Sequence, residues 1–116
     1  ISAFATSAQA VDFVQGFYYT TDHSCGISVA HALQSPEQLV VRMNWAGGSF
    51  NLVLNEDVSV NEQNHLLIDK MDQAHHYNLD FLVDSATGKL SSVLAKIDGM
   101  DIPCSGQELL LYGPLP

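Results

Sequence analysis

Apolar and polar residues alternate with a period of two along most of the chain from residue 25 onward. This alternation is typical of β-strands that turn one face to a core and the other to water. Glycine-containing segments separate the runs at residues 46–48, 85–88 and 98–99, where we expect tight turns. The sequence therefore predicts an all-β fold, an antiparallel meander that forms a small barrel or sandwich. The alternating or apolar runs cover residues 25–33, 39–45, 50–54, 65–71, 76–84, 90–97 and 109–112.

The parity of each run predicts which side chains face the core. Within residues 39–45, Arg42 and Asn44 are expected to point outward, whereas Leu33 is expected to point inward at the end of the preceding run. Val58 and Val60 keep the parity of residues 50–54, so one long bent strand is an alternative there. An aromatic group near the start of the chain is expected in the core, with one tyrosine hydroxyl reaching water. It consists of Phe13, Phe17, Tyr18 and Tyr19.

A second architecture stays open because the first part of the chain has helical spacing. Apolar residues recur every three or four positions over residues 3–19, which is typical of an amphipathic helix. A helix there would give an α+β fold, with a curved sheet wrapped against an N-terminal helix. The dipeptide Ser35-Pro36 also has the form of a helix start, but the β-branched residues that follow limit it to one turn.

The chain has 116 residues, which is enough for one domain and one core. We expect the single globular domain to span residues 11–116. Residues 1–10 are small and apolar and end in Ala8-Gln9-Ala10, which has the form of a signal-peptidase site. They are expected to be the remnant of a signal peptide or an N-terminal extension. No apolar run approaches the length of a membrane helix, so no membrane insertion is expected.

Two cysteines, Cys25 and Cys104, predict one disulfide bond. It would close a loop of about 80 residues, which the chain-entropy account values at about 4–5 kcal/mol. Structural disulfides persist in oxidising compartments. The cysteine pair and the signal-like start together predict a periplasmic or secreted protein.

The charge balance narrows the choice of partners. The chain has 4 Lys+Arg and 13 Asp+Glu, for a net charge of -9. So few cations cannot displace the counterions of a phosphate backbone, so we expect no nucleic-acid ligand. A basic protein partner fits this charge better.

The motifs that usually carry catalysis or metal binding are weak in this chain. His76, Asn78 and Asp80 share one face of an expected strand, next to His75, but no HExxH or CxxC pattern accompanies them. No nucleophile elbow and no glycine-rich phosphate loop occur either. We therefore predict that the protein is not an enzyme, binds no metal and needs no cofactor.

The layout of the chain resembles that of small periplasmic β-proteins. It runs from Gly16-Phe17-Tyr18-Tyr19 through Cys25-Gly26-Ile27-Ser28-Val29 and a series of strands to a late cysteine. Periplasmic lysozyme inhibitors share this layout, as do the immunity proteins that neutralise secreted cell-wall-degrading effectors, such as those of type VI secretion. Some of these inhibitors carry a Ser-Gly motif followed by Lys and Tyr, whereas here Ser105-Gly106 is followed by Gln107-Glu108. The resemblance implies a protein inhibitor, and it transfers the cleft-inserting serine to Ser105 through a partial match only.

The leading hypothesis is a periplasmic inhibitor or immunity protein. It would bind and block a basic secreted hydrolase of the muramidase type, such as a lysozyme-like effector, by inserting loops into its cleft. Acidic side chains would steer the two proteins together, hydroxyl groups would bond cleft carboxylates, and a lysine would supply a local cation. The expected contact residues are Glu56, Asp57, Glu62, Ser85, Thr87, Lys89 and Ser105.

Two other classes of function remain as alternatives. One is a small-molecule carrier whose apolar cavity is lined by Phe50, Leu52, Tyr77, Leu79 and Phe81. The other, less favoured, is a small enzyme that uses His76 with Asp80. A free edge strand would also make a homodimer reasonable.

Overall fold

The computed structural model describes residues 13–55 and 58–114. The signal-peptide expectation for residues 1–10, the first part of the expected helix, Glu56 and Asp57 all lie outside the described residues. The described residues form nine strands and no helix. The strands are β2 (Gly16–Thr20), β3 (Cys25–His31), β4 (Leu39–Trp45), β5 (Gly48–Leu54), β6 (His65–Met71), β7 (His76–Val83), β8 (Leu90–Ile97), β9 (Met100–Asp101) and β10 (Gln107–Pro114).

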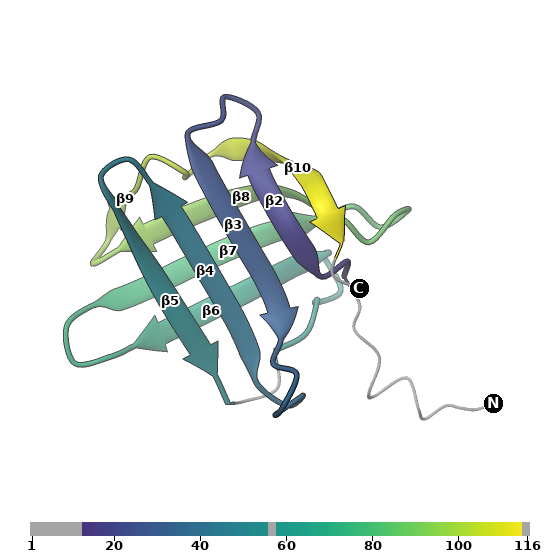
Figure 1. Ribbon diagram of the computed structural model, residues 1–116, viewed down its shortest axis with the longest axis horizontal. Coiled ribbons are helices and arrows are strands. Elements are labelled where there is room, and N and C mark those ends of the chain that lie inside the picture. The colour runs from purple at the N-terminus through teal and green to yellow at the C-terminus, as the bar shows by residue number, and fades with distance from the viewer. Residues whose placement is uncertain (1–12, 56–57, 115–116) are drawn as a thin grey trace.

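The strands pair antiparallel in the order β5-β4-β3-β2-β10-β8-β7-β6, with β9 paired to β8 outside this path. The result is the nearly closed barrel that the alternation predicted, with β5 and β6 as its two edges. Figure 1 shows two layers, which we call the front layer (β2, β3, β4 and β5) and the rear layer (β6, β7 and β8). Strand β10 joins them, because residues 109–111 and 113–114 pair with β2 while Gln107 and Glu108 pair with β8.

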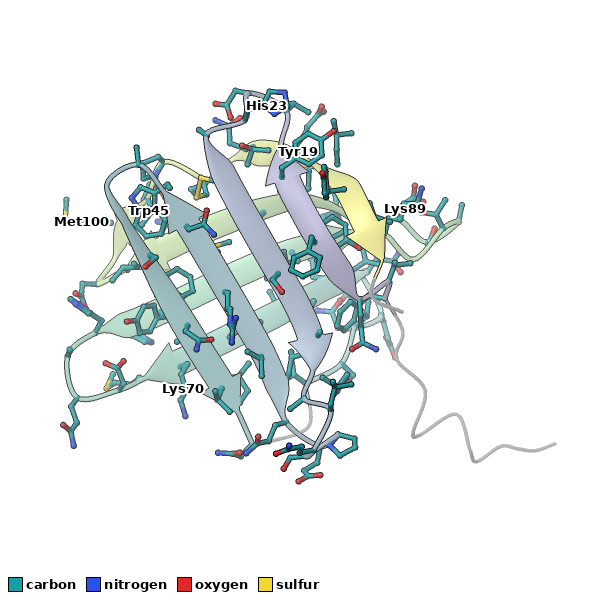
Figure 2. The ribbon with its side chains drawn as sticks, in the orientation of Figure 1. Tyr19, His23, Trp45, Lys70, Lys89 and Met100 are labelled. Carbon is teal, nitrogen blue, oxygen red and sulfur yellow. A yellow bond between two sulfur atoms is a disulfide. The ribbon has the colours of Figure 1, made fainter. Side chains whose placement is uncertain are left out.

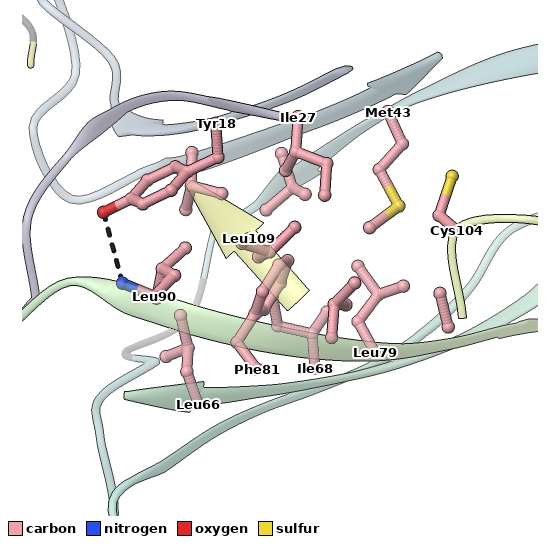
Figure 3. Close-up of a cluster of buried hydrophobic side chains, with 14 of the residues drawn as sticks. Tyr18, Ile27, Met43, Leu66, Ile68, Leu79, Phe81, Leu90, Cys104 and Leu109 are labelled. Atoms are coloured by element: carbon pink, nitrogen blue, oxygen red, sulfur yellow. Dashed lines mark hydrogen bonds between the residues drawn. The ribbon is translucent and has the colours of Figure 1, made fainter. Parts of the chain in front are cut away.

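The core lies between the two layers. Alternation fills it, since every second side chain of a strand points to the same face. Figure 3 shows how Tyr18 and Met43 from the front layer meet Leu79, Phe81 and other apolar side chains of the rear layer. The largest side chains with almost no exposure are Tyr18, Phe81, Leu39, Met43, Leu54, Leu66, Leu79 and Leu90.

The alternative of an N-terminal helix is wrong for the residues that the structure describes. Gly16–Thr20 is a strand that pairs with β3, with Gly16 opposite Val29. Helical spacing and strand alternation overlap there, because Val14 and Tyr18 satisfy both patterns. As a result, only Phe13 and Tyr18 of the expected aromatic core group are buried, and Phe17 and Tyr19 lie on the outer face.

Two smaller expectations were also wrong. Leu33 was expected to face the core, but β3 ends at His31 and the Leu33 side chain is 98% exposed. The long bent strand through Val58 and Val60 does not form, since β5 ends at Leu54. The single turn after residue 34 is confirmed, with the Ser35 carbonyl accepting a hydrogen bond from the Gln38 amide at 2.8 Å.

The predicted disulfide is confirmed between Cys25 and Cys104, whose Cα atoms lie 5.7 Å apart. It ties the start of β3 to the loop that precedes β10, and both residues are buried. The bond therefore links the front layer to the segment that closes the barrel.

Removing this disulfide should destabilise the protein strongly. The double variant Cys25→Ala/Cys104→Ala should lose about 4 kcal/mol of the free energy of unfolding, because the unfolded chain regains the freedom of a long loop. Urea unfolding followed by tryptophan fluorescence measures this. A loss below about 1 kcal/mol would show that the bond does not restrict the unfolded chain as the entropy argument requires.

A buried tyrosine connects the two layers by hydrogen bonds. The Tyr18 hydroxyl donates to the Val14 carbonyl at 2.5 Å and accepts from the Leu90 amide at 3.3 Å (Figure 3). Burial raises the pKa of Tyr18, and the hydrogen bond from the Leu90 backbone acts in the opposite direction. One hydroxyl thus satisfies a backbone group on β8 as well as one before β2.

The variant Tyr18→Phe should lower the free energy of unfolding by about 1–2 kcal/mol, because the Leu90 amide and Val14 carbonyl lose their partner. Tyr112→Phe is the matched control, since Tyr112 is 81% exposed and has no side-chain hydrogen bond within the described residues. Equal thermal stability of the two variants would contradict a bridging role for Tyr18.

Candidate functional site

The outer face of the front layer carries a groove between aromatic and polar side chains. The strand register creates it by placing Tyr19 beside Gly26, and Gly26 beside Asn44. The next row places Phe17 beside Ser28, and Ser28 beside Arg42. The small residues of β3 form a low floor between the two walls. We call this feature the outer groove and define it by Phe17, Tyr19, His23, Gly26, Ser28, Arg42, Asn44 and Tyr112.

The outer groove is open to solvent and has a volume of about 770 Å³. A second hollow of about 650 Å³ continues it toward Trp45 and Pro103, and the two share Tyr19, Gly26 and Asn44 among their lining residues. Both volumes fall in the usual range for small-ligand sites. The Asn44 amide lies over Gly26, since a Cβ at Gly26 would approach the Asn44 Oδ1 to 3.1 Å.

Four rings, those of Phe17, Tyr19, His23 and Tyr112, form the aromatic wall. The rings of Tyr19 and His23 are stacked, with centroids 5.2 Å apart and planes 9° apart. The Tyr112 ring meets Tyr19 edge to face at 6.1 Å. Figure 2 shows Tyr19 next to His23 at the end of the β2–β3 hairpin. Tyr112 and Phe17 are 81% and 49% exposed, so ring surface of this wall remains free for contact with a ligand.

A hydrogen-bonded turn holds His23 against Tyr19. The Asp22 Oδ1 accepts bonds from the Ser24 hydroxyl at 2.6 Å, from the Thr20 hydroxyl at 2.7 Å and from the Ser24 amide at 3.0 Å. Thr20 is buried, and its hydroxyl accepts a bond from the Cys25 amide at 3.1 Å. These bonds, led by the one from the Ser24 hydroxyl, lower the pKa of Asp22 to about 2. His23 itself has a positive φ of 61°, which the turn imposes.

The polar wall has no partners of its own. Within residues 13–55 and 58–114, neither the Arg42 guanidinium nor the Asn44 amide has a hydrogen-bond or ion-pair partner. Arg42 is the only arginine of the chain, and strands β2 to β5 contain no aspartate or glutamate. In a protein with a net charge of -9, this sheet face is therefore neutral to positive.

The expected contact residues divide between two regions. The turn that contains Glu62 lies beside the hairpin of Ser85, Thr87 and Lys89, because the Asn64 carbonyl accepts a hydrogen bond from the Val83 amide at 2.7 Å. We call these two loops, residues 61–64 and 84–89, the loop end. Ser105 lies elsewhere, where its hydroxyl accepts from the Ala95 amide at 2.8 Å and donates to Asp101 at 3.3 Å.

The histidines of the rear layer pair with carboxylates, but not as the sequence suggested. His76 bonds Asp69 and Asp80 bonds His65, each at 2.6 Å, so the expected His76–Asp80 pair does not form. His75 bonds Asp98 at 2.6 Å, and this bond is the main cause of the lowered pKa of Asp98. In the described part of the chain, no three His, Cys, Asp or Glu side chains are grouped to hold a metal ion.

The side chains expected to line a carrier cavity pack against one another. The rings of Phe50 and Tyr77 lie 5.0 Å apart, and Leu52, Leu79 and Phe81 belong to the buried core. The outer groove lies on the opposite side of the front layer from these side chains, whereas the second hollow is lined in part by Trp45, whose ring packs against Phe50.

The outer groove was not predicted from the sequence. The outward direction of Arg42 and Asn44 was predicted correctly, but Phe17 and Tyr19 were expected in the core and lie on the outer face. The available signal was the alternation within residues 16–20, where Phe17 and Tyr19 have opposite parity to Tyr18. The neighbours across β3 follow from the register, which the sequence alone does not give.

No described helix is long and apolar enough to span a membrane. A scan against protein-family models found no match, and searches of curated proteins and of solved structures found no significant similarity.

The turn at Asp22 should titrate at unusually low pH. Because its pKa is lowered to about 2, the stabilising bonds are fully present above pH 4 and are lost as the pH falls toward 2. Carboxyl-carbon NMR should give a midpoint near 2 for Asp22. Ser24→Ala should raise that midpoint toward the ordinary value, whereas Ser91→Ala, whose hydroxyl bonds the Leu82 carbonyl, should leave it unchanged. An unshifted Asp22 in the unmodified protein would contradict the hydrogen-bonded turn.

Proposed function

We propose that the protein is a non-catalytic binding protein of the periplasm or the exterior that blocks a basic secreted hydrolase. The observation that carries the proposal is the loop end, where two exposed polar loops lie side by side on a disulfide-linked barrel. The Cys25–Cys104 disulfide favours an oxidising compartment, where such bonds persist. The layout shared with periplasmic inhibitors and immunity proteins favours the same class.

The hairpin of the loop end is held in one shape by its own hydrogen bonds. The Asp84 carbonyl accepts from the Gly88 amide at 2.7 Å, and the Thr87 hydroxyl oxygen accepts from the Lys89 amide at 3.2 Å. The Gly88 carbonyl in turn accepts from the Val14 amide at 2.7 Å, which anchors the hairpin to the segment before β2. A loop that is ordered before binding loses little conformational entropy in the complex.

The neighbouring turn is ordered in the same way. The Asn61 Oδ1 accepts from the Gln63 amide at 2.9 Å and from the His65 amide at 3.0 Å. Glu62, at the tip, is exposed and has no side-chain partner within the described residues. The turn therefore presents a free carboxylate next to the Lys89 hairpin.

The distribution of charge favours a basic partner that binds away from strands β2 to β5. Among the described residues, carboxylates occur in the loops, on the rear layer and on β9 and β10, and none occurs on β2 to β5. Electrostatic steering would bring a basic protein to the acidic regions and leave the outer groove free.

Capture on the immobilised, oxidised protein tests the proposal. Periplasmic and secreted fractions are passed over it and eluted with rising salt. We expect a basic hydrolase that elutes as salt increases and whose activity falls in proportion to added protein. Retention of a hydrolase whose activity is unaffected would contradict inhibition, and retention of no protein would contradict the proposal.

Neutralising the free carboxylate should slow association with this hydrolase. Glu62→Gln should lower the association rate constant about two- to fivefold at low salt and leave dissociation nearly unchanged, because an exposed interface charge acts through steering. Asp101→Asn is the matched control. It removes one negative charge beside Met100, on the opposite side of the molecule from Lys89 in Figure 2. An equal effect of both variants in surface plasmon resonance would remove the loop end from the interface.

A further inference from the structure

We infer that the outer groove is a binding site for an acidic saccharide chain, one whose pyranose rings carry carboxylates. This site lies on the outer face of the front layer, which the proposed function does not use, and none of its residues belongs to the loop end. Its parts are an elongated hollow, free aromatic surface on one side and unpaired polar groups on the other.

The shape of the hollow suits a chain and not a compact molecule. The outer groove and the second hollow run together from the row of Trp45 and Cys25 to the row of Arg42 and Ser28. Three residues along β3 correspond to roughly 10 Å, enough for two or more linked pyranose rings. Gly26 has no side chain, and the Asn44 amide lies over it, so the amide borders the hollow at this point.

The aromatic wall matches the apolar faces of pyranose rings. An aromatic ring has a negative face, which attracts the weakly positive C–H groups on the flat side of a sugar. Tyr112 and Phe17 keep large exposed fractions, and Tyr19 is fixed in place by His23. These rings gather along one side of the outer groove, where they form a surface that a ligand can cover.

The polar wall explains why the saccharide would be acidic. Arg42 presents a fork of N–H donors that fits a carboxylate in bidentate fashion. No carboxylate of the described residues satisfies it, and its own sheet layer contains none in its strands. Asn44 adds an amide that can both donate to and accept from sugar hydroxyls.

A peptide cannot bind in the groove by strand addition. That mode of binding needs a free strand edge. Strand β3, the floor of the groove, is paired with β2 on one side and with β4 on the other. The groove therefore offers side chains only, which is sufficient for a saccharide.

Titration with defined oligosaccharides, followed by amide NMR of the full-length oxidised protein, tests the inference. The probes are tetragalacturonate, tetramannuronate and the methyl ester of tetragalacturonate, which has the same rings without the charge. We expect at least one uronate tetramer to shift the amides of Gly26, Ser28 and Asn44. The ester should bind about tenfold more weakly than its parent acid, because it cannot pair with Arg42.

Matched variants locate the contacts. Arg42→Gln should weaken tetragalacturonate binding about tenfold and abolish the preference over the ester, whereas Lys96→Gln removes an exposed cation of the rear layer and should change little. Tyr112→Ala should weaken both probes about threefold or more, and Leu94→Ala, on the outer face of β8, should not. The four substituted side chains are exposed, so the variants are expected to fold.

Several outcomes would overturn the inference. The first is that neither uronate tetramer, at millimolar concentration, shifts the amides of the groove. The second is that the acid and its ester bind with equal affinity. The third is that Arg42→Gln and Lys96→Gln weaken binding equally. If the captured hydrolase instead shifts the amides of the groove, the occupant is a protein and the saccharide site is wrong. Failure to capture any hydrolase leaves these saccharide measurements unaffected.

Discussion

The closure of this barrel depends on the backbone pairing of one strand, β10. Its first residues pair with β8 and its later residues pair with β2, so one segment joins two layers that otherwise pair only within themselves. The Tyr18 hydroxyl and the Cys25–Cys104 bond reinforce the same side of the barrel. Three kinds of interaction, backbone pairing, a buried hydrogen bond and a covalent bond, thus act together where an open sheet would otherwise separate.

Because closure occurs at β10, the outer surfaces of the two layers need not contribute to it. The rear layer uses its surface for His–Asp pairs such as those of His65 and His76. The front layer instead leaves Arg42 unpaired and its strands without acidic residues. Leaving Arg42 unpaired costs the protein little folding stability, because an exposed ion pair would itself contribute little. The two layers therefore differ in surface chemistry, which is acidic at the loops and rear and neutral to positive in the groove.

The sequence predicted the architecture because alternation survives in almost every strand. Residues 39–45 and 76–83 face as their parity requires, and the Cys25–Cys104 bond forms as expected. The first strand was ambiguous because a short segment with apolar residues four apart satisfies both periods. The outer groove and the His–Asp pairs depend on which residues lie opposite one another across strands. That register is set by turns and core packing together, so a single sequence does not fix it in advance.

Tyr112 occupies a bulge in β10. Leu111 lies opposite Tyr18 and Gly113 lies opposite Phe17, so the residue between them has no counterpart on β2. A residue outside the ladder is free of the pairing demands that restrict its neighbours, and the Tyr112 side chain contacts the protein mainly through Tyr19. Substitutions at this position would accumulate with little effect on folding while they reshape one wall of the groove. The bulge thus separates selection for recognition from selection for stability, and related chains could diverge in ligand preference at this one position while the barrel stays the same.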